Sequence, residues 1–228
     1  LTVCDEIRLG GGSTVNGVVR VGDTVRRPQR AGSELSRHVL VHLERAGFDA
    51  APRWLGTDSE GRDILTYIDG ETLTERGRMH PYIGDPPDRI VFSDSQVATA
   101  MRLLRTYHAA FGDDVVCHGD FGPWNLIWRD GLPVAVFDFD DVYRGDPGDD
   151  VAYALRMFIG YGFADAVPDE LVRRTQSALA AYGASFAVPT ILDREYRRAE
   201  ERCIRSGWHR QLEQLEVALD LGRAVEHA

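Results

Sequence analysis

The sequence predicts an α+β fold with a small, β-rich N-terminal lobe and a larger, mainly helical C-terminal lobe. Short alternating apolar runs dominate the first part of the 228-residue chain, whereas apolar residues at helical spacing dominate from residue 95 onward. A polar loop and a strand hairpin at residues 118–138 interrupt the helical part. The length suits one functional unit with two lobes, which we expect at residues 1–68 and 69–228.

The N-terminal elements begin with a predicted β-hairpin. Residues 18–21 and 24–27 alternate in polarity around a Gly-Asp turn, and Pro28 ends the second strand. A helix is expected next, over residues 33–46. Its buried stripe would consist of Leu35, Val39, Leu40 and Leu43. Residues 65–68 favour a strand that leads toward the second lobe.

The C-terminal lobe is predicted to follow an irregular crossing at residues 74–94, with Ser95 capping its first helix. The apolar stripe of that helix comprises Val97, Met101, Leu104, Tyr107 and Phe111. Further helices are expected at about residues 148–161, 168–182, 190–206 and 208–225.

The strongest functional signal is the loop at residues 118–125, which reads His-Gly-Asp-Phe-Gly-Pro-Trp-Asn. Residues 115–117 favour a short buried strand before it. The glycines and the proline then force an irregular loop rather than a helix. Asp120 and Asn125 are therefore expected at opposite ends of one tight loop.

A hairpin after this loop would bring Asp138 back beside Asn125. Residues 126–128 and 134–137 are apolar runs, and the Asp-Gly pair at residues 130–131 is typical of a hairpin turn. Two oxygen-bearing side chains could there hold Mg²⁺ against the phosphates of a nucleotide. The carboxylate at the start of the loop would accept the proton of an incoming hydroxyl.

These residue types also have a simpler explanation, because His, Asp and Asn are common in turns for local hydrogen-bonding reasons. That explanation suffices for any one of them. The combination is different, since residue types at fixed offsets between two strand-like runs, with a carboxylate at the end of the next strand, rarely coincide. We therefore interpret the pattern as a site for phosphoryl transfer.

The pattern resembles the aminoglycoside phosphotransferase and choline-kinase-like family, whose fold is similar to that of protein kinases. The resemblance rests on residues 118–125, 136–138 and 145–147, and weaker likeness extends in order through most of the chain. It implies a protein-kinase-like fold with ATP and Mg²⁺ as cofactors and the hydroxyl of a small molecule as phosphate acceptor.

Carried over by position, the resemblance assigns a role to each residue of the loop. Asp120 would be the catalytic base, and Asn125 and Asp138 the metal ligands. His118 and Asp150 would be structural residues that support the loop.

The N-terminal lobe would bind the nucleotide. Gly11, Gly12 and Ser13 are expected to turn N–H and hydroxyl groups toward the phosphates. The family places Lys or Arg on a following strand, and Arg26 is the expected cation, with Arg27 on the opposite face of a regular strand. Two solvent-facing arginines on an edge strand are the alternative.

The chain departs from the kinase-like pattern in the helix that follows. Such folds pair the strand cation with a helix glutamate, but the second turn of the predicted helix offers no carboxylate, and Glu34 is the nearest one. This puts catalytic efficiency in doubt. Thr66, Tyr67 and Ile68 would form the strand that leads into the hinge, where backbone groups read an adenine edge.

Composition narrows the partners. A net charge of −10 argues against nucleic acid and fits a cationic small molecule better. No apolar run approaches the length of a membrane span, and early charges break any signal-peptide pattern, so a cytoplasmic protein is expected. Cys4, Cys117 and Cys203 form no metal-binding or disulfide pattern.

Two other functions remain open. The first is a degenerate kinase that acts as a binding or immunity module, because residues 19–28 look like phosphotransferase relatives described as toxin-immunity proteins. The second is a metal-dependent hydrolase that uses Asp120 and Asp138. The sequence leaves open the acceptor among aminoglycoside-, choline- and amino-sugar-like molecules, the choice of ATP or GTP, and the oligomeric state.

Overall fold

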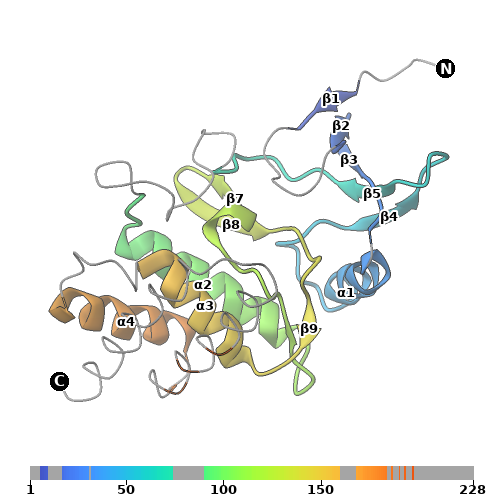
Figure 1. The fold of residues 1–228 in the computed structure, drawn as a ribbon. Coiled ribbons are helices and arrows are strands. Elements are labelled where there is room, and N and C mark those ends of the chain that lie inside the picture. Colours follow the sequence, from blue (N-terminus) through green and yellow to red (C-terminus); the bar gives the residue numbers. More distant parts are fainter. Residues whose placement is uncertain are drawn as a thin grey trace.

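The computed structural model describes residues 6–9, 17–30, 32–73, 90–159 and 168–183, and residues 186, 190, 193 and 197. The glycine run with Ser13 and most of the predicted crossing and of the last two predicted helices lie outside these residues. The described elements form two groups, a sheet with one helix and a helical group with short strands (Figure 1).

The N-terminal group is a five-stranded antiparallel sheet in the order β1-β2-β3-β5-β4. Its strands are β1 (Ile7–Arg8), β2 (Val19–Val21), β3 (Thr24–Arg27), β4 (Trp54–Thr57) and β5 (Asp63–Thr66). The predicted hairpin is confirmed, with Val19 opposite Arg26 and Gly22 in the turn at a φ of 58°. Glycine suits this turn because a positive φ costs it nothing.

Helix α1 (Ser33–Arg45) follows β3 and ends beside Gly47, as the sequence predicts. The buried residues of the helix are Ser33, Ser36, Val39, Leu40 and Leu43. Leu35 was expected in this stripe, but it is 48% exposed. The buried stripe of α1 therefore includes Ser33 and Ser36 in place of Leu35. The hydroxyls of both serines lie on the side of the helix that faces the second group.

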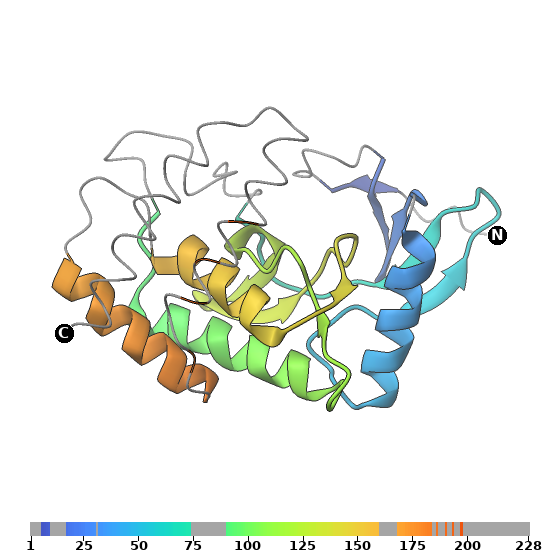
Figure 2. The ribbon, with the colours of Figure 1, turned by 60° about the horizontal axis from the view of Figure 1, so that its bottom comes forward.

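The C-terminal group contains α2 (Asp94–Ala109), α3 (Pro147–Ile159) and α4 (Pro168–Tyr182), which pack against one another (Figure 2). The cap of α2 is Ser93 rather than the predicted Ser95, because Ser93 and Gln96 form a capping box. The apolar stripe of α2 is confirmed at Val97, Met101, Leu104 and Tyr107, which are almost fully buried.

Short strands carry the loop between the helices. Strand β6 (Val116–Cys117) pairs with β9 (Tyr143–Arg144), and β7 (Leu126–Arg129) pairs with β8 (Leu132–Val136). The predicted β7–β8 hairpin is confirmed, and its turn has positive φ at both Asp130 and Gly131. A single 3₁₀ turn, η1 (Pro123–Asn125), joins the polar loop to β7.

Backbone hydrogen bonds tie the two groups together. Val136 N donates to Ala50 O at 2.9 Å, and Glu71 and Trp128 exchange a pair of bonds at 2.8 Å. The end of the β7–β8 hairpin is thus fixed against the segments that flank β4 and β5.

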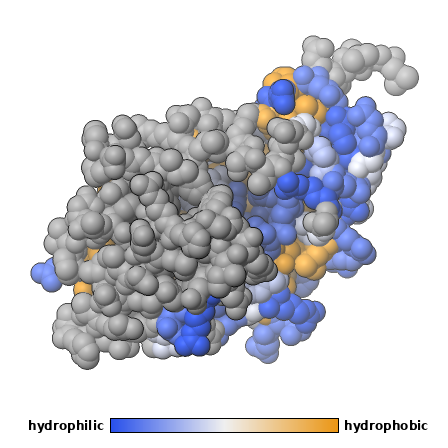
Figure 3. Space-filling model, viewed as in Figure 1, coloured by the Kyte–Doolittle hydropathy of each residue, from blue (hydrophilic) through white to orange (hydrophobic). Residues whose placement is uncertain are grey.

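The described surface is mainly hydrophilic on the face that Figure 3 shows, with a few separate apolar patches. Large exposed apolar side chains come from different elements, including Ile7, Leu55 and Val91. Isolated residues of this kind are normal for a globular surface. Among the described helices, none combines the length and the hydrophobicity that a bilayer crossing requires.

Leu104→Ala tests the position of the core. Leu104 is 0% exposed on α2, so the truncation should lower the free energy of unfolding by about 3 kcal/mol through lost burial and a residual cavity. Leu55→Ala is the matched control, because Leu55 is 52% exposed and should change stability by no more than about 0.5 kcal/mol. Urea denaturation measures both, and equal losses would contradict this description of the core.

Candidate active site

The loop between β6 and β7 has a backbone conformation that requires glycine at position 119. Gly119 has a φ of 80°, and a Cβ at this position would collide with the backbone oxygen of Asp141. Only glycine avoids both the left-handed strain and this collision. The loop therefore passes close to the segment that follows Asp138, and the two functional segments of the sequence lie together.

Three donors fix the carboxylate of Asp120. Its Oδ2 accepts hydrogen bonds from Asn125 Nδ2 at 2.7 Å and Trp124 Nε1 at 3.1 Å, and its Oδ1 accepts one from the Tyr153 hydroxyl at 2.5 Å. A carboxylate held by both oxygens has a defined direction. Asp120 is thus presented as a rigid acceptor rather than as a mobile surface group.

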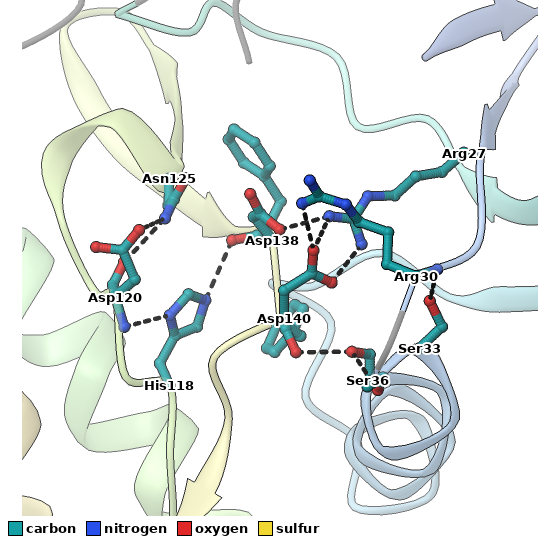
Figure 4. Close-up of polar contacts among 12 residues, drawn as sticks. Arg27, Arg30, Ser33, Ser36, His118, Asp120, Asn125, Asp138 and Asp140 are labelled. Carbon is teal, nitrogen blue, oxygen red and sulfur yellow. Dashed lines mark hydrogen bonds and ion pairs between the residues drawn. The ribbon is translucent and has the colours of Figure 1, made fainter. Parts of the chain in front are cut away.

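Asn125 faces Asp120 through its amide nitrogen (Figure 4). The same Nδ2 donates to the backbone oxygen of Asp120 at 3.0 Å, so both amide hydrogens are used there. This orientation directs the amide oxygen away from Asp120. The backbone oxygen of Asn125 accepts a bond from Phe137 N at 3.0 Å, which holds Asn125 next to the segment that carries Asp138.

Asp138 follows β8 in a left-handed backbone conformation, with a φ of 65°. Asp is among the few residue types that tolerate this region. Its Oδ1 accepts a hydrogen bond from Arg27 Nη2 at 2.7 Å. Burial raises the pKa of Asp138, although the positive charge of Arg27 opposes this rise, and the nearby charge of Asp120 adds to it.

Arg27 reaches this site from the N-terminal sheet. Its Nη1 and Nη2 donate to the two carboxylate oxygens of Asp140 at 2.7 and 2.6 Å, in addition to the bond with Asp138 (Figure 4). Burial lowers the pKa of Arg27, but the hydrogen bond to Asp140 and the charge of Asp138 outweigh burial and raise it. The guanidinium therefore stays charged between two carboxylates.

The expected strand cation, Arg26, is on the other face of β3. It donates to Thr24 Oγ1 at 2.6 Å and lies 3.8 Å from a carboxylate oxygen of Asp58. Successive side chains of a strand point to opposite faces, so only one of the two arginines can face the second lobe. Arg27 therefore faces the second lobe and Arg26 does not, while the role of Arg26 as the nucleotide-binding cation stays a prediction.

Helix α1 contributes hydroxyl groups rather than a carboxylate. Glu34 is exposed, whereas Ser36 Oγ donates to the backbone oxygen of Phe139 at 2.8 Å (Figure 4). Arg37 forms an ion pair with Asp63 at 2.8 Å. Among the described residues of α1, no carboxylate faces Arg27.

The expected hinge residues lie at the end of β5. Thr66 N and Tyr67 N already donate within the N-terminal group, to Arg53 O at 3.0 Å and to Asp23 O at 2.9 Å. These two N–H groups are therefore engaged, and Ile68 is the remaining candidate donor of the three. The role of residues 66–68 stays a prediction, as do those of Gly11, Gly12 and Ser13, which lie outside the described residues.

A buried carboxylate on α3 supports the loop from beneath. Asp150 is 0% exposed and accepts hydrogen bonds from His118 N at 2.6 Å, Gly119 N at 2.9 Å and His108 Nε2 at 3.0 Å. Burial would raise the pKa of Asp150, but the bond from His108 and the surrounding positive charge lower it below the ordinary value. Asp150 is thus a buried anion that orients the loop backbone.

Two neighbours complete this support. His118 is buried, and its Nε2 donates to Phe137 O at 3.1 Å, which links the loop to the end of the hairpin. Cys117, His108 and Asp150 place possible metal-ligand atoms within 4.8 Å of one another. Each of these residues is already hydrogen-bonded, with Cys117 Sγ donating to Asp146 O at 3.2 Å, so the cluster has a structural explanation.

Sequence reasoning missed Tyr153 as a partner of Asp120, and it placed Arg27 on the opposite face of β3 and Asp140 at the substrate entrance rather than together. Tyr153 follows Asp150 by three residues on one helix, and this spacing places both on the same face. The Asp150–Tyr153 spacing was therefore a usable signal. The pairing of Asp140 with Arg27 carried no such signal, because the two residues are more than a hundred positions apart in the chain.

Comparison with known proteins agrees with this geometry. Residues 94–187, which include the loop, the hairpin and α3, match the model of the phosphotransferase enzyme family. This region is similar to that family. The resemblance to aminoglycoside phosphotransferases and choline kinases is thereby confirmed.

Solved structures of phosphotransferases share the fold. The ternary complex of streptomycin, ATP and APH(2'')-IIa gives a TM-score of 0.58 at 16% identity, covering 94% of this chain and 93% of the other. A choline/ethanolamine kinase family protein from Mesorhizobium loti gives 0.54 at 15% identity, with 98% and 88% covered. Choline kinase LicA from Streptococcus pneumoniae gives 0.52 at 14%, with 98% and 94% covered. The expected protein-kinase-like fold is confirmed.

A curated relative has a different description. The trifolitoxin immunity protein of Rhizobium leguminosarum bv. trifolii is 33% identical over 156 residues, which cover 60% of this chain. The match covers 55% of that relative's own length. The match to the phosphotransferase model and the name of this relative therefore differ in the activity that each names.

Asp150→Asn tests the buried anion. The amide cannot accept the same set of bonds, so the variant should be less stable than the wild type by about 2 kcal/mol or more at pH 7. Because the folded pKa lies below the ordinary 3.8, the unfolded chain takes up the proton first on acidification. The stability contributed by Asp150 should therefore be present above that value and decline as the pH falls below it.

Urea denaturation of both proteins between pH 7 and pH 3 measures the difference. The gap between wild type and variant should narrow at the acid end. Asp49→Asn is the control, because Asp49 is an exposed carboxylate. A gap that stays constant down to pH 3 would show that Asp150 does not act as an ionised group.

Proposed function

We propose that this protein is an ATP- and Mg²⁺-dependent phosphotransferase that acts on a hydroxyl group of a small molecule. The observation that supports the proposal most strongly is the grouping of Asp120, Asn125 and Asp138 around one loop and hairpin, with Arg27 opposite Asp138. Phosphoryl transfer needs a base-like carboxylate, hard-cation ligands and a cation for the phosphates. These side chains supply each of them.

The donor set fits a magnesium ion. Asp138 offers a carboxylate, and Asn125 offers an amide oxygen because its nitrogen is committed to Asp120. Oxygen ligands of this kind suit Mg²⁺ bound together with substrate phosphates. When bound, the ion would neutralise charge on the transferred phosphate.

Asp120 would act on the acceptor. Its carboxylate accepts hydrogen bonds from Asn125, Trp124 and Tyr153, which keep the group oriented without placing a positive charge against it. An oriented carboxylate can align the acceptor hydroxyl and take its proton as the new bond to phosphorus forms. The transfer is direct, with no covalent intermediate on the protein.

Arg27 would contact the nucleotide phosphates from the N-terminal lobe. Its planar guanidinium suits bidentate contact with phosphate oxygens as well as with carboxylates. In this assignment residues 1–68 form the nucleotide-binding lobe and residues 69–228 the catalytic and substrate-binding lobe. Gly11, Gly12, Ser13 and residues 66–68 would complete the nucleotide site.

The acceptor is proposed at the level of a class. Relatives of the same fold are named for streptomycin and choline, which are hydroxylated and cationic. The net charge of −10 on this chain favours a cationic acceptor as well. We therefore propose a hydroxylated amine or amino sugar.

A second candidate is a catalytically weak nucleotide-binding or immunity module. It is favoured by the 33% identity to a toxin-immunity protein and by the lack, among the described residues of α1, of a carboxylate paired with Arg27. Such a module would bind nucleotide, or the toxin itself, without transferring phosphate. The two candidates make different predictions for Asp120.

Asp120→Asn tests the phosphotransferase directly. An acceptor is first identified by a thermal-shift screen of hydroxylated amines and sugars with Mg²⁺ and a non-hydrolysable ATP analogue. With that acceptor, the variant should lose turnover on the order of a hundredfold or more, because the amide cannot take the proton. Nucleotide affinity should change little.

Asp130→Asn is the matched control, since Asp130 lies in the exposed β7–β8 turn and asparagine tolerates its positive φ. Its turnover should equal that of the wild type. Unchanged turnover in Asp120→Asn would refute the role of the base. Wild-type protein that binds nucleotide but transfers no phosphate to any acceptor would favour the immunity module.

Asp138→Ala tests the metal site. Removing the carboxylate should abolish the dependence of nucleotide affinity on Mg²⁺, because Asn125 alone offers one oxygen. Calorimetric titration with ATP, with and without Mg²⁺, measures this dependence. Asp113→Ala, at an exposed position, should behave as the wild type. A variant whose affinity still rises with Mg²⁺ to the same extent would remove Asp138 from the site.

A further inference from the structure

Asp140 holds Arg27 by both oxygens. Nη1 and Nη2 of Arg27 donate to Oδ1 and Oδ2 of Asp140 at 2.7 and 2.6 Å, the two-point geometry in which arginine binds carboxylates most strongly. The side chains of Arg27 and Asp140 are only 15% and 19% exposed. Partial burial reduces the screening of the pair by water.

The contact supplies Arg27 with a carboxylate partner that the sequence did not predict. In kinase-like folds the strand cation is paired with a helix glutamate, yet α1 turns Ser36 toward this region and leaves Glu34 exposed. The carboxylate that pairs with Arg27 comes instead from the segment after β8. The same carboxylate lies 3.5 Å from Arg30 Nη1, so it joins two cations of the N-terminal part.

The backbone around Asp140 is anchored to α1. Ser36 Oγ donates to the oxygen of Phe139, the residue before Asp140, and a Cβ on Gly32 would stand 3.7 Å from the backbone oxygen of Asp140. The start of α1 and the Asp138–Asp140 segment are therefore in direct contact. A change in the position of one would displace the other.

We propose that Asp140 is the positioning residue for Arg27 and replaces the helix carboxylate that the chain lacks. This inference rests on the proposed function. Asp140 keeps the guanidinium beside Asp138, where it can reach the phosphates of a bound nucleotide. The missing helix glutamate then does not imply a missing ion pair.

The sharing of Arg27 explains why Asp140 matters for the metal ligand. Arg27 Nη2 donates to both Asp138 and Asp140. A cation at Asp138 would compete with Arg27 for the same carboxylate. When a cation weakens the contact between Arg27 and Asp138, Asp140 still holds Arg27. Without Asp140, the guanidinium would have Asp138 as its main partner and would oppose cation binding.

The test is a double-mutant cycle on nucleotide affinity. Calorimetry or displacement of a fluorescent ATP analogue is applied to wild type, Arg27→Ala, Asp140→Ala and the double variant, each with Mg²⁺. Asp140→Ala should weaken binding about tenfold, the effect of losing a charged hydrogen-bonded pair. In the Arg27→Ala background the same substitution should cause no further loss, because Asp140 acts through Arg27.

Further measurements separate positioning from a general loss of structure. Asp140→Ala should raise the Mg²⁺ concentration needed for half-maximal nucleotide binding, and Asp140→Glu should restore most of the affinity. With the acceptor found by the screen, KM for ATP should rise more than kcat falls. Asp140→Asn, which keeps the shape, serves in place of alanine if Asp140→Ala does not fold. Asp49→Ala removes an exposed N-lobe carboxylate and should change none of these values.

The outcomes separate the positioning role of Asp140 from the proposed phosphotransferase function. Losses that multiply in the double variant, or an Asp140→Glu protein as weak as Asp140→Ala, would overturn the positioning role while leaving the phosphotransferase proposal intact. Wild-type protein that binds no nucleotide at all would overturn both.

Discussion

The geometry of the candidate site depends on one buried anion. Asp150 accepts hydrogen bonds from two backbone N–H groups of the loop at residues 118–125 and from a ring N–H of His108, and these bonds offset the cost of removing a carboxylate from water. One turn further along the same helix, Tyr153 donates to Asp120. Helix α3 therefore holds the loop twice, at its backbone and at its functional side chain. Because both contacts arise from one helix face, the direction of the Asp120 carboxylate follows from where α3 packs.

A second constraint joins the lobes through charge. Arg27 lies between Asp138 and Asp140, and the burial of this group makes an unpaired charge costly for either partner. The bond from Ser36 to Phe139 adds a neutral contact beside the ion pairs. Together, these ion pairs and this hydrogen bond fix the position of the N-terminal sheet relative to the β7–β8 hairpin, next to the metal-ligand candidates. The lobes are thus connected beside Asp138, the candidate metal ligand.

The sequence was informative where a feature is local. The loop from His118 to Asn125, the hairpin that returns to Asp138 and the helices α1, α3 and α4 depend on neighbours within about twenty residues, and turn chemistry and periodicity could predict them. The sequence could not predict which face of β3 meets the second lobe, since shifting a strand by one residue exchanges Arg26 for Arg27. Leu35 was misplaced for a related reason, because the direction of the buried stripe of α1 is set by the Phe139 segment it meets. The role of Asp140 was hidden because its partners lie in the other lobe.

The arrangement around Asp120 bears on the choice between catalysis and binding alone. A module that only bound a nucleotide or a toxin would transfer no proton, so it would not use the defined direction of the Asp120 carboxylate for catalysis. Orienting a side chain costs conformational freedom, and that cost is offset here by the bonds from Trp124, Asn125 and Tyr153. Such orientation is what proton transfer from a substrate hydroxyl requires. In the proposed role of Asp140, the carboxylate that pairs with Arg27 comes from the segment after β8, so the missing α1 carboxylate does not by itself argue for a degenerate site. The orientation of Asp120 is therefore the feature of the described site that supports the proposed phosphotransferase.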